Sequence, residues 1–185
     1  MNDTAGYDEA AQAREQATRI RVAVGSDERT SSTDAAVDHL RSRGLDVVTA
    51  GPLADRAADW VQVAEEVGRS VAEGRTDKAV LFCYTGTGAS MAVNKIPGVR
   101  GALCVDAETA RGARRWNDAN VLVLSYRLAT ETLVREIIDA FLDTAADPAE
   151  AATIAQLGAL ERAAAAESAA NLGEPAATES AAPTD

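Results

Sequence analysis

A cysteine followed at once by a glycine-broken, hydroxyl-rich turn is the part of this sequence best suited to chemistry. Cys83 follows the apolar run 78–82, which has the pattern of a buried strand, and residues 91–95 read as the body of a short helix. The turn between them therefore lies at the carboxyl end of a strand, where α/β enzymes bind their ligands. Its candidate residues are the thiol and the small or hydroxyl-bearing residues after it: Cys83, Thr85, Gly86, Thr87, Gly88 and Ser90.

Two interpretations of this turn are open. Its glycines allow successive backbone N–H groups to face one point, which suits a phosphate group or the oxygen of a developing enolate. The turn could equally be a tight strand-to-helix connection with a buried, inert cysteine, because such turns are common and one G-x-G is a weak signal.

The chain around this turn alternates short apolar strands with helices, which predicts a parallel sheet. The strands are expected over 20–25, 45–49, 78–82, 99–105 and 120–125, and the helices over 32–43, 59–73, 91–95, 107–116 and 130–142. Right-handed crossovers then give a Rossmann-like three-layer αβα sandwich with a five-stranded parallel sheet. Site candidates are the residues just after strands, which add Asp27, Asp106, Tyr126 and Arg127 to the Cys83 turn.

The pattern divides the chain into one domain with appendages. The expected parts are a flexible N-terminal arm over 1–19, the α/β domain over 20–144, a possible dimer-arm helix over 145–168 and a disordered acidic tail over 169–185. The expected arm helix carries a thin apolar stripe that a partner subunit could cover, made of Ile154, Leu157 and Leu160.

Length and charge exclude several classes of partner. A chain of 185 residues with 46% apolar content can bury the core of one α/β domain. A formal net charge of −11 argues against nucleic acid and anionic membrane surfaces as partners. An anionic small molecule remains a possible substrate, because part of the negative charge lies in the tail.

The cysteine and histidine content argues against metal and disulfide chemistry. Two cysteines, Cys83 and Cys104, occur without a visible signal peptide or an apolar run of about 18 residues, which favours a cytoplasmic protein with free thiols. The single histidine, His39, is expected on a helix surface. One histidine and two separated cysteines form no ligand cluster, so we predict no metal site and no cofactor.

Several motifs in one order resemble the family of type B ribose-5-phosphate isomerases and galactose-6-phosphate isomerase subunits. The resemblance spans roughly residues 20–144. The matching pieces are Gly25-Ser26-Asp27, the Cys83 turn, the segment Asn94 to Arg100, Ala102-Leu103-Cys104, the segment Trp116 to Val121, and Arg127.

The resemblance implies aldose–ketose isomerisation of a phosphorylated sugar through a cis-enediolate, which needs no cofactor. The family's base is the thiolate at the position of Cys83, and the hydroxyl at Thr85 assists proton movement between the oxygens. By the same resemblance Asp27 binds substrate hydroxyls, Asn117 the enediolate oxygen and Arg127 the phosphate. From the residues alone, the favoured explanations are a helix cap for Asp27, a loop hydrogen bond for Asn117 and a surface cation for Arg127.

The sequence also departs from the family pattern. Glu28 and Trp116 occupy positions where members usually carry histidines, and the second of those histidines is thought to open the ring of a furanose substrate. Tyr84 replaces a glycine and narrows the turn, and Trp60 replaces the tyrosine of a tyrosine–proline pair. The family's basic C-terminal segment is replaced by an acidic, alanine-rich one, in which Arg162 could stand in for the missing arginines.

Three functions compete as explanations of these departures. The chain could be an active isomerase of a short substrate without a ring, such as a tetrose or tetrulose 4-phosphate, which suits the bulky Trp60, Tyr84 and Trp116, with Glu28, Trp60 and Trp116 among the substrate-binding residues. It could instead be a catalytically silent or accessory subunit, or a module that senses a sugar phosphate. Family members are dimers or higher assemblies with shared sites, so we expect a homodimer or higher homo-oligomer.

Overall fold

Five parallel strands form a single sheet in this protein. The computed structural model describes residues 19–173, so most of the expected N-terminal arm and the end of the expected tail lie outside the described residues. The strand order is β2-β1-β3-β5-β4. The strands are β1 (Arg21–Ser26), β2 (Asp46–Ala50), β3 (Lys78–Cys83), β4 (Gly101–Leu103) and β5 (Val121–Ser125).

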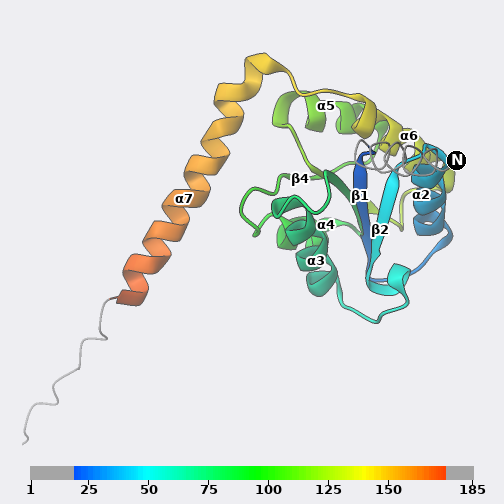
Figure 1. Cartoon of the computed structure of the whole chain (residues 1–185), viewed down its shortest axis with the longest axis horizontal. Coiled ribbons are helices and arrows are strands. Elements are labelled where there is room, and N and C mark those ends of the chain that lie inside the picture. Colours follow the sequence, from blue (N-terminus) through cyan, green and yellow to red (C-terminus); the bar gives the residue numbers. More distant parts are fainter. Residues whose placement is uncertain (1–18, 174–185) are drawn as a thin grey trace, which may run out of the picture.

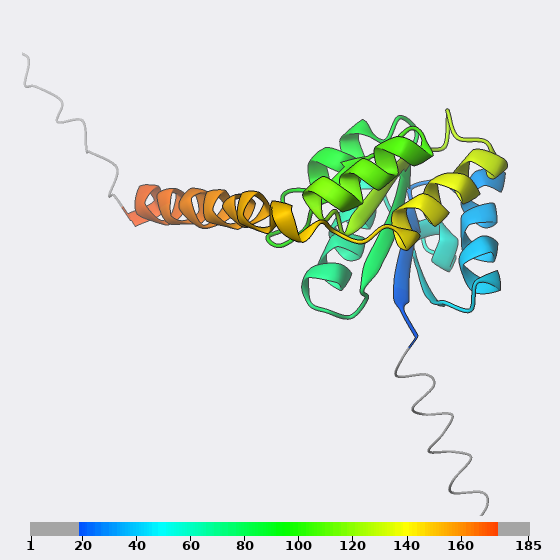
Figure 2. The ribbon, with the colours of Figure 1, turned by 90° about the horizontal axis from the view of Figure 1, so that it is seen from above.

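Helices cover both faces of this sheet (Figures 1 and 2). One face packs against α2 (Ser31–Ser42), α5 (Ala107–Asn117) and α6 (Glu131–Asp143). The other packs against α3 (Trp60–Ala72) and α4 (Thr87–Val93). The predicted Rossmann-like αβα sandwich is confirmed.

The alternation of side chains along the strands divides the core into two halves. In β3, Val80 and Phe82 lie in the half under α2, α5 and α6, whereas Leu81 and Cys83 lie in the half under α3 and α4. Successive side chains of a strand point to opposite faces, so this division follows from the period of two. The thiol of Cys83 therefore belongs to the α3 and α4 side of the sheet.

Side-chain caps begin several of the helices at the carboxyl edge of the sheet. Asp59 accepts hydrogen bonds from the N–H groups of Val61 and Gln62 at the start of α3. Asp106 accepts from the N–H of Thr109, at 2.7 Å, at the start of α5. A carboxylate at this position satisfies free N–H groups of the first helical turn. Asp106, a candidate by its place after a strand, is thus a helix cap.

The edge strand β4 is shorter than the predicted strand over 99–105. The Asn94 side chain accepts from the N–H of Gly101, at 2.9 Å, and donates to the carbonyl oxygen of Gly101, at 2.8 Å. The amide thereby occupies backbone groups that an edge strand leaves free for pairing with another chain.

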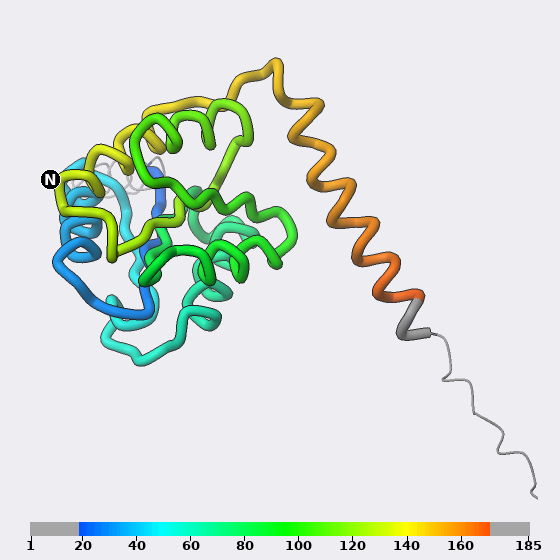
Figure 3. Tube along the Cα trace, turned by 180° about the vertical axis from the view of Figure 1, so that it is seen from behind, coloured from blue at the N-terminus to red at the C-terminus, as the bar shows by residue number. Residues whose placement is uncertain are grey.

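The last helix, α7 (Ala151–Gly173), extends away from the domain after the short turn η2 (Pro148–Glu150), as Figures 1 and 3 show. It continues five residues past the expected end of the arm helix at residue 168. Leu157 and Leu160 are 43% and 67% exposed, respectively. The Glu161 carboxylate accepts a hydrogen bond from the Gly98 N–H at 3.1 Å, which ties the first half of the helix to the loop before β4.

Candidate functional site

A thiol and a carboxylate meet at the carboxyl ends of the neighbouring strands β1 and β3. The Cys83 Sγ atom donates a hydrogen bond to the Asp27 Oδ2 atom at 3.9 Å. Cys83 is 7% exposed, and the second carboxylate oxygen of Asp27 is buried without a hydrogen-bond partner among the described residues. A buried carboxylate oxygen without a partner is costly, so it is available to accept a hydrogen bond from a ligand.

Burial raises the pKa of the Asp27 carboxyl, and the negative charge of the neighbouring Glu28 raises it further. The backbone hydrogen bond and the Cys83 thiol oppose this shift by stabilising the charged form. Glu28 itself is exposed, and its backbone N–H donates to the Ser26 Oγ atom at 3.2 Å. A perturbed carboxyl beside a thiol at a sheet edge is a pattern typical of functional sites.

The turn after Cys83 becomes helical earlier than the sequence predicts. Gly86 adopts the left-handed conformation, at φ +79°, and α4 begins at Thr87 rather than at residue 91. Thr87, Gly88 and Ser90 therefore lie in the first turn of this helix, and no side chain among the described residues caps its N–H groups. The hydroxyls of Thr85 and Thr87 are joined by a hydrogen bond of 2.7 Å.

Trp60, the first residue of α3, lies over this first turn of α4. A Cβ atom added to Gly88 would lie 3.2 Å from the Trp60 ring. The two residues belong to different helices, and the glycine permits their close approach. Two of the site candidates, Trp60 and Gly88, are thus brought together near the Cys83 strand end.

Backbone hydrogen bonds tie the ends of β3 and β5 to each other. The N–H of Tyr126 donates to the Cys83 carbonyl oxygen, and the N–H of Arg127 to the Tyr84 carbonyl oxygen, each at 3.2 Å. The Ser125 hydroxyl also donates to the Tyr84 carbonyl oxygen, at 2.7 Å. Arg127 is exposed and forms no ion pair with any residue between 19 and 173. Its guanidinium is therefore free to bind an anion.

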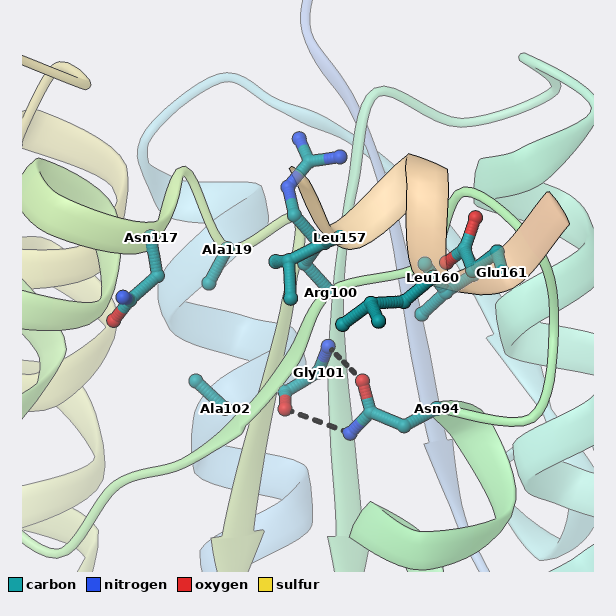
Figure 4. Close-up of a pocket in the computed structure, with 10 residues that line it drawn as sticks. Asn94, Arg100, Gly101, Ala102, Asn117, Ala119, Leu157, Leu160 and Glu161 are labelled. Carbon is teal, nitrogen blue, oxygen red and sulfur yellow. Dashed lines mark hydrogen bonds between the residues drawn. The ribbon is translucent and has the colours of Figure 1, made fainter. Parts of the chain in front are cut away.

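Trp116 and Asn117 lie elsewhere within this chain. They end α5, which starts at the carboxyl edge after β4 and runs back to the amino edge before β5. Asn117 lines a hollow of about 370 Å³ with Ala102 and the α7 residue Leu157, as Figure 4 shows. Trp116 packs on Gly112 of its own helix. Within one chain these two residues therefore do not lie beside Cys83, because a helix that follows a strand carries its last residues to the opposite edge.

Tyr126 was a site candidate because it follows a strand, but the sequence suggested no chemical role for it. Its ring meets the Tyr84 ring edge-on, with centroids 5.8 Å apart. Burial raises the pKa of Tyr126 to about 12, and the negative charges of Asp27 and Glu28 contribute to the shift. The only sequence signal for it was its position directly after β5.

The single histidine and the second cysteine both take structural positions. The His39 Nε2 atom lies 2.7 Å from the Asp139 carboxylate of α6, and the His39 side chain is only 17% exposed. The expected helix-surface histidine is thus part of the packing between two helices. Burial raises the pKa of the Cys104 thiol to about 12. Across residues 19–173 no three acidic, histidine or cysteine side chains are grouped as metal ligands would be, and no helix is long and apolar enough to cross a membrane.

Fold and site together define a Rossmann-like α/β protein with a thiol and a carboxylate at the carboxyl edge of its sheet. The sequence profile of the Ribose/Galactose Isomerase family matches residues 22–157. The chain is 37% identical to ribose-5-phosphate isomerase B of Escherichia coli (strain K12) over 106 residues, which are 57% of this chain and 71% of the relative. It is 31% identical to D-erythrulose-4-phosphate isomerase of Pectobacterium atrosepticum over 127 residues, 67% of this chain and 83% of the relative.

Solved structures agree with the sequence comparisons. Ribose-5-phosphate isomerase B of Clostridium thermocellum matches this structure with a TM-score of 0.74 and 30% identity, over 78% of this chain and 99% of that one. The chain belongs to the ribose/galactose isomerase family. The prediction of a sugar-phosphate isomerase is confirmed at the level of the enzyme class.

Proposed function

We propose that this protein interconverts an aldose phosphate and a ketose phosphate through a cis-enediolate, with the Cys83 thiolate as the base. The observation that carries the proposal is the Cys83 thiol at the sheet edge, 3.9 Å from the Asp27 carboxylate and next to the uncapped first turn of α4. The thiolate takes the proton from the carbon beside the carbonyl, and the resulting thiol returns a proton to the neighbouring carbon. N–H groups of the first helical turn hold the oxyanion, and the Thr85 hydroxyl assists proton movement between the two oxygens.

The substrate we propose is a four-carbon sugar 4-phosphate. Such a sugar cannot close a five-membered ring, because its terminal oxygen is already esterified. The absence of an imidazole at positions 28 and 116 then costs nothing, and the one histidine, His39, is held by Asp139 between α2 and α6. Similarity to an enzyme named for D-erythrulose 4-phosphate supports this choice. Bulky Trp60 beside Gly88 supports a shorter substrate as well.

We further propose a homodimer or higher homo-oligomer whose sites are shared between subunits. Trp116 and Asn117 can act with Cys83 only if they come from a second copy, because they end the helix at the opposite edge of the sheet. The exposed Leu157 and Leu160 on the projecting helix α7 offer that copy an apolar surface. In this arrangement Asn117 of the second copy would hold the enediolate oxygen and Arg127 the phosphate.

Two free thiols support the predicted cytoplasmic location.

An isomerisation assay on ribose 5-phosphate, D-erythrose 4-phosphate and D-erythrulose 4-phosphate tests the proposal. The matched variants are Cys83→Ala and Cys104→Ala, since both thiols are buried but only Cys83 lies beside Asp27. We expect activity on the four-carbon substrates that is lost in Cys83→Ala and kept in Cys104→Ala. Activity that survives in Cys83→Ala would rule out the cysteine base, and activity on ribose 5-phosphate alone would rule out the four-carbon substrate.

An accessory subunit or a sugar-phosphate sensor is the second candidate. The observation that favours it is the acidic α7 in place of a basic segment, which leaves fewer cations for a phosphate. Such a protein would bind four-carbon sugar phosphates without turnover, and Cys83→Ser would leave that binding intact. Calorimetric titration beside the assay distinguishes it from an active isomerase.

A further inference from the structure

The phenol of Tyr126 is a polar group at the sheet edge that the proposed chemistry does not yet use. Tyr126 follows β5 directly, and its backbone N–H is bonded to the Cys83 carbonyl oxygen at 3.2 Å. The register pairs Ser125 with Cys83, so the backbone of Tyr126 lies one residue past the position opposite Cys83 on the neighbouring strand. The position of its backbone is therefore set by the same strand ends that hold Cys83.

Packing fixes the Tyr126 ring at this edge. One part of the ring packs against the core half under α2, α5 and α6, and the Tyr84 ring meets it edge-on at 5.8 Å with an interplanar angle of 64°. Tyr84 is itself tied down through its carbonyl oxygen, which accepts from both Ser125 and Arg127. A ring held on two sides keeps its hydroxyl in a narrow range of positions, as a donor to a reacting group requires.

The surroundings of the hydroxyl make it a donor. Burial and the negative charges of the nearby Asp27 and Glu28 raise the pKa of the phenol to about 12, so it keeps its proton. Within residues 19–173 the hydroxyl has no hydrogen-bond partner in the side-chain network of the site. The buried Oδ1 atom of Asp27 lacks a partner too. A free donor and a free acceptor at one sheet edge match a molecule that carries a carbonyl beside a hydroxyl.

We propose that Tyr126 is a catalytic residue whose O–H donates a hydrogen bond to the substrate oxygen that becomes the enediolate oxyanion, while Asp27 accepts from the adjacent hydroxyl. The inference rests on the proposed isomerase function. When Cys83 removes the proton from carbon, the electron pair of the C–H bond forms the C=C bond and the carbonyl π pair moves to oxygen. The phenol stabilises that oxygen without giving up its proton. When the Cys83 thiol reprotonates the former carbonyl carbon, the C=C pair forms the new C–H bond and the adjacent O–H pair becomes the new C=O bond. The proton released from that hydroxyl passes to the oxyanion with the help of the Thr85 hydroxyl, so the first oxygen ends as a hydroxyl.

The test is Tyr126→Phe, which removes the hydroxyl and keeps the ring. The negative charge on the oxygen develops only after proton abstraction, so kcat is expected to fall about 100-fold, as for the loss of one oxyanion donor, whereas KM changes by less than about threefold. Exchange of the substrate C–H proton with solvent deuterium is expected to fall by the same factor as kcat, because both pass through the enediolate. The Tm is expected to remain that of the wild type.

Tyr84→Phe is the comparison variant, since it removes the hydroxyl of the partner ring. An equal loss of kcat in both variants would assign the effect to the ring pair and overturn the proposal, as would a Tyr126→Phe enzyme with unchanged kcat or with a change in KM alone. A phosphorylated hydroxamate, which resembles the enediolate, is the second readout and is expected to bind Tyr126→Phe more weakly by a similar factor. Unchanged hydroxamate affinity also overturns the proposal.

Different results would refute the proposed isomerase function and the proposed role of Tyr126. Full activity in Cys83→Ala refutes the cysteine base whatever Tyr126→Phe does. Loss of activity in Cys83→Ala with normal kcat in Tyr126→Phe refutes only the role of Tyr126. A wild-type protein that neither turns over a sugar phosphate nor binds the hydroxamate refutes both.

Discussion

A single methyl group at Gly51 tests how firmly the end of β1 is held. Gly51 starts the short turn η1 (Gly51–Ala54) after β2 and has a φ of +65°. A Cβ atom there would lie 2.7 Å from the Ser26 carbonyl oxygen and 2.7 Å from the Val63 side chain. The Ser26 contact is with backbone, directly before Asp27, so relief of the clash must move the strand end that carries this carboxylate.

The expected cost of Gly51→Ala has two parts. The left-handed backbone costs an alanine about 1 kcal/mol, and overpacking against fixed backbone costs about 2 kcal/mol more. A total of about 3 kcal/mol corresponds to a fall in Tm of about 6–12 °C for a domain of this size. Displacement of Asp27 is expected to lower kcat/KM as well.

Gly44→Ala is the matched control, because Gly44 has a φ of +77° but no atom within 4 Å of an added Cβ. It should cost only the backbone part, about 1 kcal/mol, and leave kcat/KM unchanged. Urea unfolding followed by circular dichroism, with the isomerisation assay on the same samples, measures both effects. Equal destabilisation by the two substitutions would refute the reasoning, since it would mean that the Ser26 backbone yields to the methyl group at no cost.

Three further outcomes follow from the structure. The raised pKa of Asp27 means that the folded state binds its proton more tightly than the unfolded state does. The ionised carboxylate therefore destabilises the fold above its folded pKa, and this effect disappears as the pH falls through that pKa. Asp27→Asn should raise the Tm at neutral pH while it lowers activity, and a lower Tm would contradict this. Arg114→Met removes one of the two guanidinium groups paired with the Asp118 carboxylate, at 2.6 Å, and leaves Arg100 at 2.8 Å. With the lost hydrogen bond from Arg114 to the buried Ala119 carbonyl oxygen, it should cost about 2 kcal/mol in urea unfolding. A cost below about 1 kcal/mol would refute the importance of these contacts. Asn94→Ala removes both hydrogen bonds to Gly101 on the edge strand. It should lower the free energy of unfolding by about 1–2 kcal/mol and increase light scattering on heating, because the edge is left free to pair with another chain. Unchanged stability and scattering would show that the Asn94 side chain does not protect this edge.

The central part of the candidate site was predictable from local sequence. Cys83 after an apolar run and Asp27 after another identify two strand ends, and neighbouring parallel strands bring their carboxyl ends to one edge. The same reasoning places Asn117 away from Cys83 within one chain. It ends a helix that follows β4, so it lies at the opposite edge of the sheet from Cys83.

The start of α4 and the length of β4 were not predictable in the same way. Gly86 in the left-handed conformation begins the helix at Thr87, and hydroxyl-bearing residues there resemble a loop in sequence. The segment 99–105 has strand composition, but only Gly101–Leu103 pairs with β5, and the Asn94 side chain binds backbone groups of Gly101 on the free edge. Both outcomes depend on contacts between segments that the local pattern does not contain.

The sequence by itself determined the sheet, its helical layers and the strand-end position of the thiol, because hydrophobic period and helix stops act over a few neighbouring residues. Only the tertiary structure decided which side chains meet there. Asp27 faces Cys83 at 3.9 Å across two strands, and Tyr126 meets Tyr84 from a third strand end. It also decided that His39 serves helix packing, through Asp139 a hundred residues away. Distances between side chains far apart in sequence are set by strand order and packing, and a chemical site is made of such distances.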